Sequence, residues 1–497
     1  MVLLSTQPIT WAATLLLTVH LPRYLDGRAM GELSIAMSAA AIVGTLAGFG
    51  LTTVLTRTVA SHKAGASAAV SASLVIVTGL SMLGAAITVM IGLSGRVPDI
   101  GVPLLTLAMV GMIVVQVQAV LFAVLAGQQR LGEFAWVNAA ALLIASVGSV
   151  GVLMLGGSAA HMLGVSLVVT LASTLLLWHR VRVPFDRSGL TRNRLLDLVR
   201  SGLPFVAWNV LLRVRGDVDS LVLAGLLSIE AVGWWSAAQR IISIPVFVPV
   251  LVITPLLPAL SSVRHDREVF TRTLRRTFEL TVIVTTGITV AIVAFAPLVP
   301  TTLGWAEGYV AAVPIIQLMA PLLIFVAITM VMGTGIISLG RERPWLLVNA
   351  VATALQFVVL FIAIPATQDA LGNGAIGAAF GRIAAEIIMV AGALLILPRG
   401  MIGWAAWYLL ARTLVVGAAS VVAALALLDQ SMILAGAVGV FTYAAGLLLL
   451  RVIRPSDLGQ LVQATQATIR RRSQASSAVP PMPDTPVEQR DGTPVRF

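Results

Sequence analysis

The sequence predicts an all-α polytopic membrane protein, and three of its features predict this class. Only 11% of the 497 residues are charged, 58% are hydrophobic, and the mean hydropathy is +0.98. Apolar stretches of about 20 residues, the length at which an α-helix crosses a bilayer, recur along most of the chain. The basic residues gather in alternate connections between those stretches. A soluble protein of this length would be about a quarter charged, so two soluble domains are excluded.

About fourteen apolar stretches are predicted to span the membrane, and the first lacks the positive segment and cleavage site of a signal peptide. We expect an N-terminal six-helix lobe in residues 1–178, a basic cytoplasmic linker in 179–200 and a C-terminal six-helix lobe in 201–399. Two additional transmembrane helices follow in 400–452, and a polar, largely disordered cytoplasmic tail in 453–497. The predicted spans are residues 3–22, 32–55, 68–94, 103–127, 134–155, 158–178, 202–227, 232–260, 278–300, 310–338, 344–366, 373–397, 404–427 and 432–451.

The positions of the basic residues give the orientation of these spans. If the N-terminus is cytoplasmic, 24 of the 32 basic residues fall in segments on the cytoplasmic side, and only Arg23, Arg28 and Arg96 fall outside. A missed or an extra span would reverse the sides of everything that follows it. Because cytoplasmic loops of membrane proteins are enriched in Arg and Lys, this distribution predicts fourteen spans with both termini in the cytoplasm.

The two lobes are predicted to be repeats of one another. The second span opens with GELSIA at 31–36, and the eighth opens with GWWSAA at 233–238, 202 residues later. The tripeptide VNA at 137–139 returns at 348–350, and the glycine pair of 157 and 164 returns at 374 and 381. Six spans return the chain to its starting side, so the two units run parallel. Transporters built this way place the substrate site between their halves.

Several segments resemble the polysaccharide-flippase branch of the multidrug/oligosaccharidyl-lipid/polysaccharide exporter (MOP) superfamily. Its first two spans are similar to RYLDGRAMGELSIA and GFGLTTVLTRTVA, and its spans 7 and 8 to SGLPF, DVDSLVLAGLLSIEAVGWWSAAQRI and PLLPALSS. Spans 10 and 11 are similar to GYVAAVPIIQLMAPLLIF and ISLGRERPWLLVNAV, so the resemblance covers about residues 20 to 400. It implies two six-helix lobes around a central cavity that opens alternately to each side. It also implies transport of an undecaprenyl-type lipid that carries a sugar pyrophosphate, and lipid II flippases share this architecture.

The seventh span carries four charges in the stretch LLRVRGDVDSLVLAG at 211–225. Charges inside a membrane are costly, so they are expected to pair or to face a cavity. Arg213 and Asp217 are four residues apart, as are Arg215 and Asp219, and each pair can meet on one side of a helix. The two pairs lie about 200° apart on a regular helix, so only one can face a cavity unless the helix breaks between them. We predict that Arg215 and Asp219 form the cavity pair and that the other pair joins helices or lies near the headgroups.

Other spans also carry charges. Arg240 is enclosed in the eighth span, and Arg382 and Glu386, four apart in the twelfth, are predicted to pair. The resemblance places Arg23 and Arg57 in stretches where lipid II flippases have cavity arginines. Guanidinium groups suit pyrophosphate because they donate paired hydrogen bonds to its oxygens. The substrate-binding candidates are therefore Arg23, Arg57, Arg213, Arg215, Arg240 and Arg382, and the coupling or charge-pair candidates are Asp217, Asp219 and Glu386.

These features predict a flippase that moves a lipid-linked oligosaccharide or polysaccharide precursor to the outer leaflet of the bacterial cytoplasmic membrane, without ATP hydrolysis. No phosphate loop surrounds the single lysine, Lys63. Two alternatives remain: a cation-coupled multidrug antiporter of the same superfamily, and a membrane polysaccharide polymerase or glycosyltransferase, to which the DVD at 217–219 gives weak support. The expected partners are the lipid-pyrophosphate-linked glycan, membrane lipids and enzymes of the same pathway.

We expect a monomer that is not an enzyme and that binds no nucleic acid, cofactor or metal. The chain has no cysteine, and its five histidines are widely separated.

Overall fold

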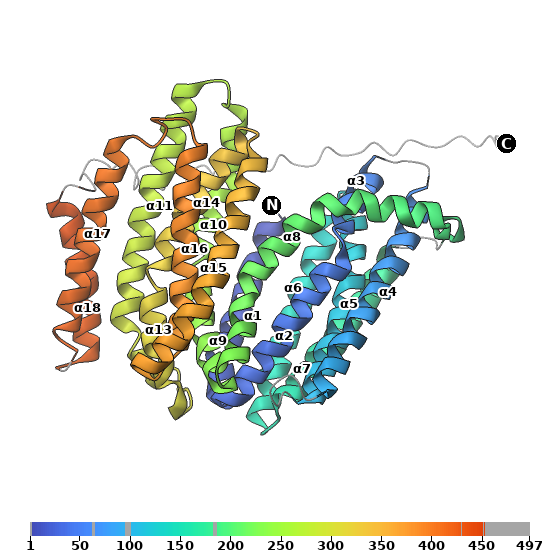
Figure 1. Cartoon of the computed structure of the whole chain (residues 1–497), viewed down its shortest axis with the longest axis horizontal. Coiled ribbons are helices and arrows are strands. Elements are labelled where there is room, and N and C mark those ends of the chain that lie inside the picture. Colours follow the sequence, from blue (N-terminus) through green and yellow to red (C-terminus); the bar gives the residue numbers. More distant parts are fainter. Residues whose placement is uncertain are drawn as a thin grey trace, which may run out of the picture. The chain divides into compact units, whose positions relative to one another are not determined.

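The computed structural model describes residues 2–61, 65–94, 101–181, 186–428, 430–450 and 452, and every element of regular secondary structure in them is a helix (Figure 1). The predicted tail, residues 453–497, lies outside the described residues. Residues Met1–Tyr443 form one compact unit, and Ala444–Phe497 a second. The helices are α1 (Val2–Tyr24), α2 (Gly27–Gly48), α3 (Leu51–Ala60), α4 (Ala66–Leu93), α5 (Val102–Gly127), α6 (Leu131–Met154), α7 (Ala159–Val181), η1 (Arg187–Leu190), α8 (Arg192–Leu226), α9 (Ile229–Ser243), α10 (Phe247–Ser262), α11 (Arg267–Phe295), α12 (Leu298–Thr302), η2 (Glu307–Ala311), α13 (Ala312–Met319), α14 (Leu322–Ser338), α15 (Glu342–Leu371), α16 (Ala375–Ile396), α17 (Trp404–Leu425) and α18 (Met432–Leu449).

Ten helices of the described part are long and apolar enough to cross a membrane, and two bent pairs raise this number to twelve. The bent pairs are α9 with α10 and η2–α13 with α14. The all-α, multi-pass prediction is therefore confirmed. The fourteen predicted spans include α1 and α8 as well, and neither helix meets the same criterion of length and composition.

Breaks in the predicted spans fall at glycine and proline. The second predicted span divides into α2 and α3 at Phe49 and Gly50, whose φ angles of 46° and 64° are left-handed. The 49° bend between α9 and α10 includes Pro245, and the 43° bend before α14 includes Pro321. Proline bends a helix because it lacks the backbone N–H and its ring crowds the preceding turn.

The helices of the first unit gather in two groups (Figure 1). Helices α1 to α7, drawn in blue to teal, pack on one another, and helices α10 to α16, drawn in yellow-green to orange, do the same. We call these the N-terminal group and the C-terminal group. Helix α8 packs against α2 on one side and α15 on the other, and α9 packs against both α2 and α13. These two helices therefore connect the groups. The second half of the predicted linker forms the start of α8.

A close contact joins α2 and α9. A Cβ atom added to Gly31 would lie 1.9 Å from the carbonyl oxygen of Ile229, and one added to Gly233 would lie 1.9 Å from the carbonyl oxygen of Gly27. Only glycine allows the two backbones to approach this closely. The two contacts are equivalent under the 202-residue offset of the predicted repeat, because Gly27 corresponds to Ile229 and Gly31 to Gly233. We call these four residues the α2–α9 seal.

Further contacts lie at the same end of α2. The Tyr309 hydroxyl donates hydrogen bonds to the carbonyl oxygens of Leu25 and Asp26, each at 3.1 Å. The backbone N–H of Ala306 donates to the carbonyl oxygen of Pro22, also at 3.1 Å. The turn between α1 and α2 is thus fixed to η2 and the residue before it.

Candidate functional site

A cavity of about 850 Å³ lies between the two helix groups. It begins at Leu33 of α2, two residues beyond Gly31, and at Ser236 of α9, three residues beyond Gly233. It is lined by residues of α2, α5, α7, α8, α9, α13, α14 and α16. Residues of α2 and α9 that are 202 positions apart, the offset of the predicted repeat, both line the cavity, and Ser38 and Arg240 are one such pair. Four of the lining residues are charged at neutral pH, and these are Arg213, Asp217, Arg240 and Arg382.

The Arg213–Asp217 pair, and not the predicted Arg215–Asp219 pair, lies in the cavity wall. The Arg213 Nε lies 2.7 Å from an Asp217 carboxylate oxygen, and both side chains are partly exposed. Helix α8 runs unbroken through this region, so the two sets of charges lie on opposite faces, as the sequence predicts. The choice of face was wrong, because the α8 face that carries Arg215 and Asp219 is directed toward α15 and α16.

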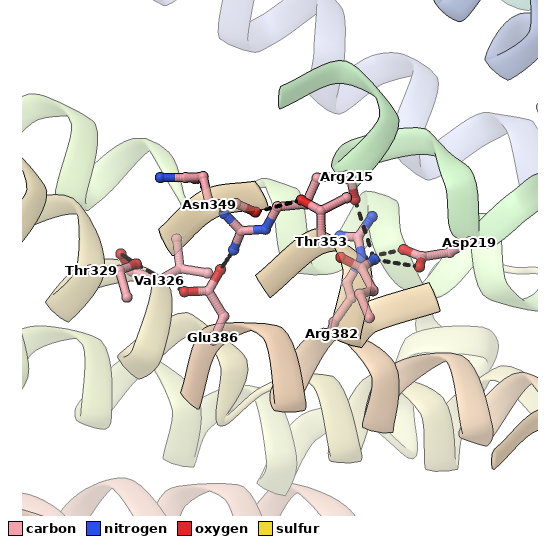
Figure 2. A network of polar contacts seen from close by, with 9 residues as sticks. Arg215, Asp219, Val326, Thr329, Asn349, Thr353, Arg382 and Glu386 are labelled. Atoms are coloured by element: carbon pink, nitrogen blue, oxygen red, sulfur yellow. Dashed lines mark hydrogen bonds and ion pairs between the residues drawn. The ribbon is translucent and has the colours of Figure 1, made fainter. Parts of the chain in front are cut away.

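Arg215 and Asp219 form ion pairs with α16 rather than with each other (Figure 2). Arg215 pairs with Glu386, and Arg382 donates from Nε to Asp219 at 2.5 Å. The predicted local pair of Arg382 and Glu386 is therefore wrong as well. The physical reason is that the facing sides of α8 and α16 each carry a cation and an anion four residues apart, in an order that lets each charge meet its opposite on the other helix.

The Arg215–Glu386 pair is completed by neutral groups. The Thr329 hydroxyl donates to the second oxygen of Glu386 at 2.9 Å, and Arg215 donates to the amide oxygen of Asn349 at 3.5 Å (Figure 2). The Glu386 side chain is only 7% exposed. A buried ion pair is tolerated when its remaining donors and acceptors are satisfied in this way. Neither Arg215 nor Glu386 lines the cavity.

The Asp219–Arg382 pair connects the buried network with the cavity. Asp219 is fully buried and accepts from the amide of Gln356 at 2.7 Å. Arg382 is 21% exposed and is part of the cavity wall. Among the four charges that join α8 to α16, Arg382 alone lines the cavity.

Arg240 has a different environment. It lies on α9 in the cavity wall, its Nε is buried, and no acceptor for this Nε is present in the described part of the chain. No carboxylate of the described residues forms a salt bridge with it. An unpaired guanidinium facing a cavity can bind an anion through charge-assisted hydrogen bonds.

The family model described as polysaccharide biosynthesis protein matches residues 1–264, which is more than half of the chain. The chain belongs to this family. No curated protein matches the sequence.

Comparison with solved structures gives the fold of this chain. It is similar to the lipid II flippase MurJ in an inward closed conformation, with a TM-score of 0.72, 12% identity, and coverage of 89% of this chain and 97% of that one. It is also similar to a multidrug resistance MATE family transporter of the MOP superfamily in an inward-facing conformation, with a TM-score of 0.58, 16% identity, and coverage of 79% and 97%. The predicted resemblance to this superfamily is confirmed.

Two of the predicted substrate-binding arginines lie outside the cavity wall. Arg23 is exposed at the end of α1, where its guanidinium lies 5.7 Å from the centre of the Tyr24 ring. Arg57 is exposed on α3, with its guanidinium 5.3 Å from the centre of the Phe205 ring. The structure therefore brings three of the six predicted arginines together in the cavity, namely Arg213, Arg240 and Arg382.

The sequence analysis missed the neutral partners in the network. On α15, Asn349, Thr353 and Gln356 are buried. They stand at intervals of four and three residues, which places them on one face of the helix. This polar stripe in an apolar span is visible in the sequence and could have indicated that a neighbouring helix carries buried charges. No cluster of potential metal ligands occurs among the described residues of the protein.

Proposed function

We propose that this protein is a flippase that moves a lipid-linked oligosaccharide or polysaccharide precursor from the cytoplasmic to the outer leaflet, by alternating access and without ATP hydrolysis or any catalytic step. The observation that carries this proposal is the arginine-lined cavity between the helix groups, with Arg240 unpaired in its wall. Three arginines and one aspartate line the cavity, so its wall has an excess of positive charge. A pyrophosphate that links a lipid to a glycan has the opposite charge and the oxygens that guanidinium groups bind.

The arrangement of the helices supports the transport step. Helix α2 of the predicted N-terminal lobe and α9 of the predicted C-terminal lobe meet closely at the α2–α9 seal, and the helices separate beyond it around the cavity. If α1 and α8 cross the membrane with the twelve other spans, the chain has fourteen and both termini are cytoplasmic. The seal then lies toward the outer face of the bacterial cytoplasmic membrane, and the cavity is closed on that side. Opening requires the two lobes to separate at the seal.

A cation-coupled antiporter of the same superfamily is the second candidate, and the similarity to the MATE fold favours it. A cationic drug would have to bind beside three arginines, and Asp217, the acid in the cavity wall, is already paired with Arg213. Like charges at close range disfavour such a ligand. A polymerase or glycosyltransferase has no comparable support, since the two aspartates of the DVD sequence lie on opposite faces of α8 and are both ion-paired.

Replacing Arg240 by glutamine is expected to weaken the binding of undecaprenyl pyrophosphate at least about tenfold, because a hydrogen bond to a charged group contributes about 1.5–3 kcal/mol. Binding is measured with purified protein in nanodiscs, with uncharged undecaprenol as the second ligand. Arg412→Gln is the control, because Arg412 lies in α17, contacts the Tyr408 ring and does not line the cavity. Equal affinity of the wild type for the two lipids, or unchanged binding by Arg240→Gln, contradicts the proposal.

The proposed orientation can be tested with introduced cysteines, because the natural chain has none. Asn193→Cys, at the exposed start of α8, is expected to react with a membrane-impermeant maleimide only from the cytoplasmic side. Leu155→Cys, at a position that is 89% exposed between α6 and α7, is expected to react only from outside. Labelling of both from one side would rule out the proposed topology.

A further inference from the structure

Of the two ion pairs between α8 and α16, only one includes a residue of the cavity wall. Arg215 and Glu386 pair away from it, whereas Arg382 pairs with Asp219 and also forms part of the cavity wall. Both pairs are buried and both join the same two helices. The Arg215–Glu386 pair can therefore serve as a control for the Asp219–Arg382 pair. The Asp219–Arg382 pair can affect a ligand in the cavity, whereas the Arg215–Glu386 pair can only join the two helices.

Arg382 is held on several sides of its guanidinium. Its Nε donates to Asp219 at 2.5 Å, and its Nη2 donates to the carbonyl oxygen of Gly216 at 2.7 Å (Figure 2). The group lies 5.5 Å from the centre of the buried Trp235 ring. The amide of Gln239, another residue of the cavity wall, lies beside Nη1 and Nη2 and accepts from both when its oxygen is turned toward them. Together, these contacts hold the Arg382 guanidinium in one orientation.

Asp219 is itself fixed by a further residue. One carboxylate oxygen accepts from Arg382, and the other accepts from Gln356 of α15 at 2.7 Å. Asp219 has no exposed surface, so it cannot touch a ligand in the cavity. Its effect on a ligand must pass through Arg382.

We propose that Asp219 is the positioning residue for Arg382, and that Arg382 is a second contact, beside Arg240, for the anionic group of the ligand. Gln356 completes the chain by holding Asp219. The proposal rests on the proposed function for the identity of the ligand, which is a lipid-linked pyrophosphate. A side chain held in its binding orientation loses little conformational entropy when the ligand arrives, and this raises the affinity.

The test compares Asp219→Asn with Glu386→Gln in nanodiscs, using undecaprenyl pyrophosphate as the probe. Both changes remove the acid of one buried ion pair and keep its shape. Asp219→Asn is expected to weaken binding about tenfold, as the loss of one charge-assisted contact does, and Glu386→Gln to change it less than about threefold per folded molecule. Asp219→Glu, which restores the carboxylate, is expected to recover part of the affinity. Equal losses for Asp219→Asn and Glu386→Gln overturn the proposal, since they indicate a purely structural role.

The fluorescence of Trp235 supplies a readout that needs no ligand. A cation next to an indole ring shifts its emission, so release of Arg382 in Asp219→Asn is expected to shift the spectrum, and the shift is expected to vanish in the Trp235→Phe background. Glu386→Gln is expected to leave the spectrum unchanged. If Asp219→Asn does not fold, Gln356→Leu serves instead and is expected to give a smaller shift in the same direction.

The two readouts separate the two proposals. A wild-type protein that does not bind the pyrophosphate lipid contradicts the proposed function, while the spectrum still tests whether Asp219 positions Arg382. No shift of the spectrum in either variant overturns the positioning role.

Discussion

The double variant Gly31→Ala and Gly233→Ala is expected to lose most of its transport and to leave the cavity open at the α2–α9 seal. Each added methyl group would lie 1.9 Å from a carbonyl oxygen of the facing helix, a distance that no Cβ atom can keep. Overpacking of this kind costs about 1–3 kcal/mol for each site, so the closed arrangement would lose roughly a factor of five or more in population for each change. The change destabilises the closed conformation relative to the open one, because the clash exists only when α2 and α9 are in contact.

Opening is measured with Ser38→Cys, a cavity position, in the cysteine-free chain. In an otherwise wild-type protein, this cysteine is expected to resist an impermeant maleimide added from outside; with the two alanines it is expected to react. Gly79→Ala is the matched control, because a Cβ atom on Gly79 of α4 would meet nothing within 4 Å. Full transport by the double variant, or equal labelling in the presence and absence of the alanines, would contradict the role of the seal.

Replacing Glu386 by alanine is expected to destabilise the protein by about 3–5 kcal/mol, because Arg215 would remain buried without its counter-charge. The double variant Arg215→Met with Glu386→Leu is expected to recover most of this loss, since apolar side chains of similar size remove both charges together. The free energy of unfolding is measured in detergent by the fluorescence of the ten tryptophans.

Glu268→Ala is the control for this prediction. Its pair with Arg272 lies at the exposed start of α11, and an exposed pair contributes only about 0–1 kcal/mol. If Glu386→Ala is no less stable than Glu268→Ala, the buried pair does not hold α8 to α16 as described.

Local spacing predicted the helices and the opposite faces of α8 well, but it could not predict which helix each face meets. The intervals between Arg213, Arg215, Asp217 and Asp219 fix their directions around one helix, since these depend only on the helical repeat. The partners Arg382 and Glu386 lie more than 160 residues away, and they meet α8 through packing. From spacing alone, Arg382 and Glu386 were predicted to pair with each other, because they are four residues apart on one helix. This prediction was wrong, since each pairs with a residue of α8.

The repeat is predicted from sequence matches, and the structure adds a contact between two of the matched segments. The match between GELSIA and GWWSAA predicted that the two segments are equivalent. It did not predict that Gly31 and Gly233 lie in the same contact, where each glycine meets the residue four positions before the other. Arg23 and Arg57 were assigned to a cavity by resemblance. A resemblance identifies the helix on which a residue lies, but it does not determine the direction in which the side chain points.

The charges of the cavity wall are unevenly distributed. Under the 202-residue offset of the predicted repeat, Arg240 corresponds to Ser38, and all four charged wall residues come from α8, α9 and α16. The wall formed by α2, α5 and α7 carries no charged side chain. An elongated molecule with one anionic end would therefore enter with a fixed polarity, its anionic end against α8, α9 and α16 and its neutral part against α2, α5 and α7. Its orientation would be set before either helix group moves.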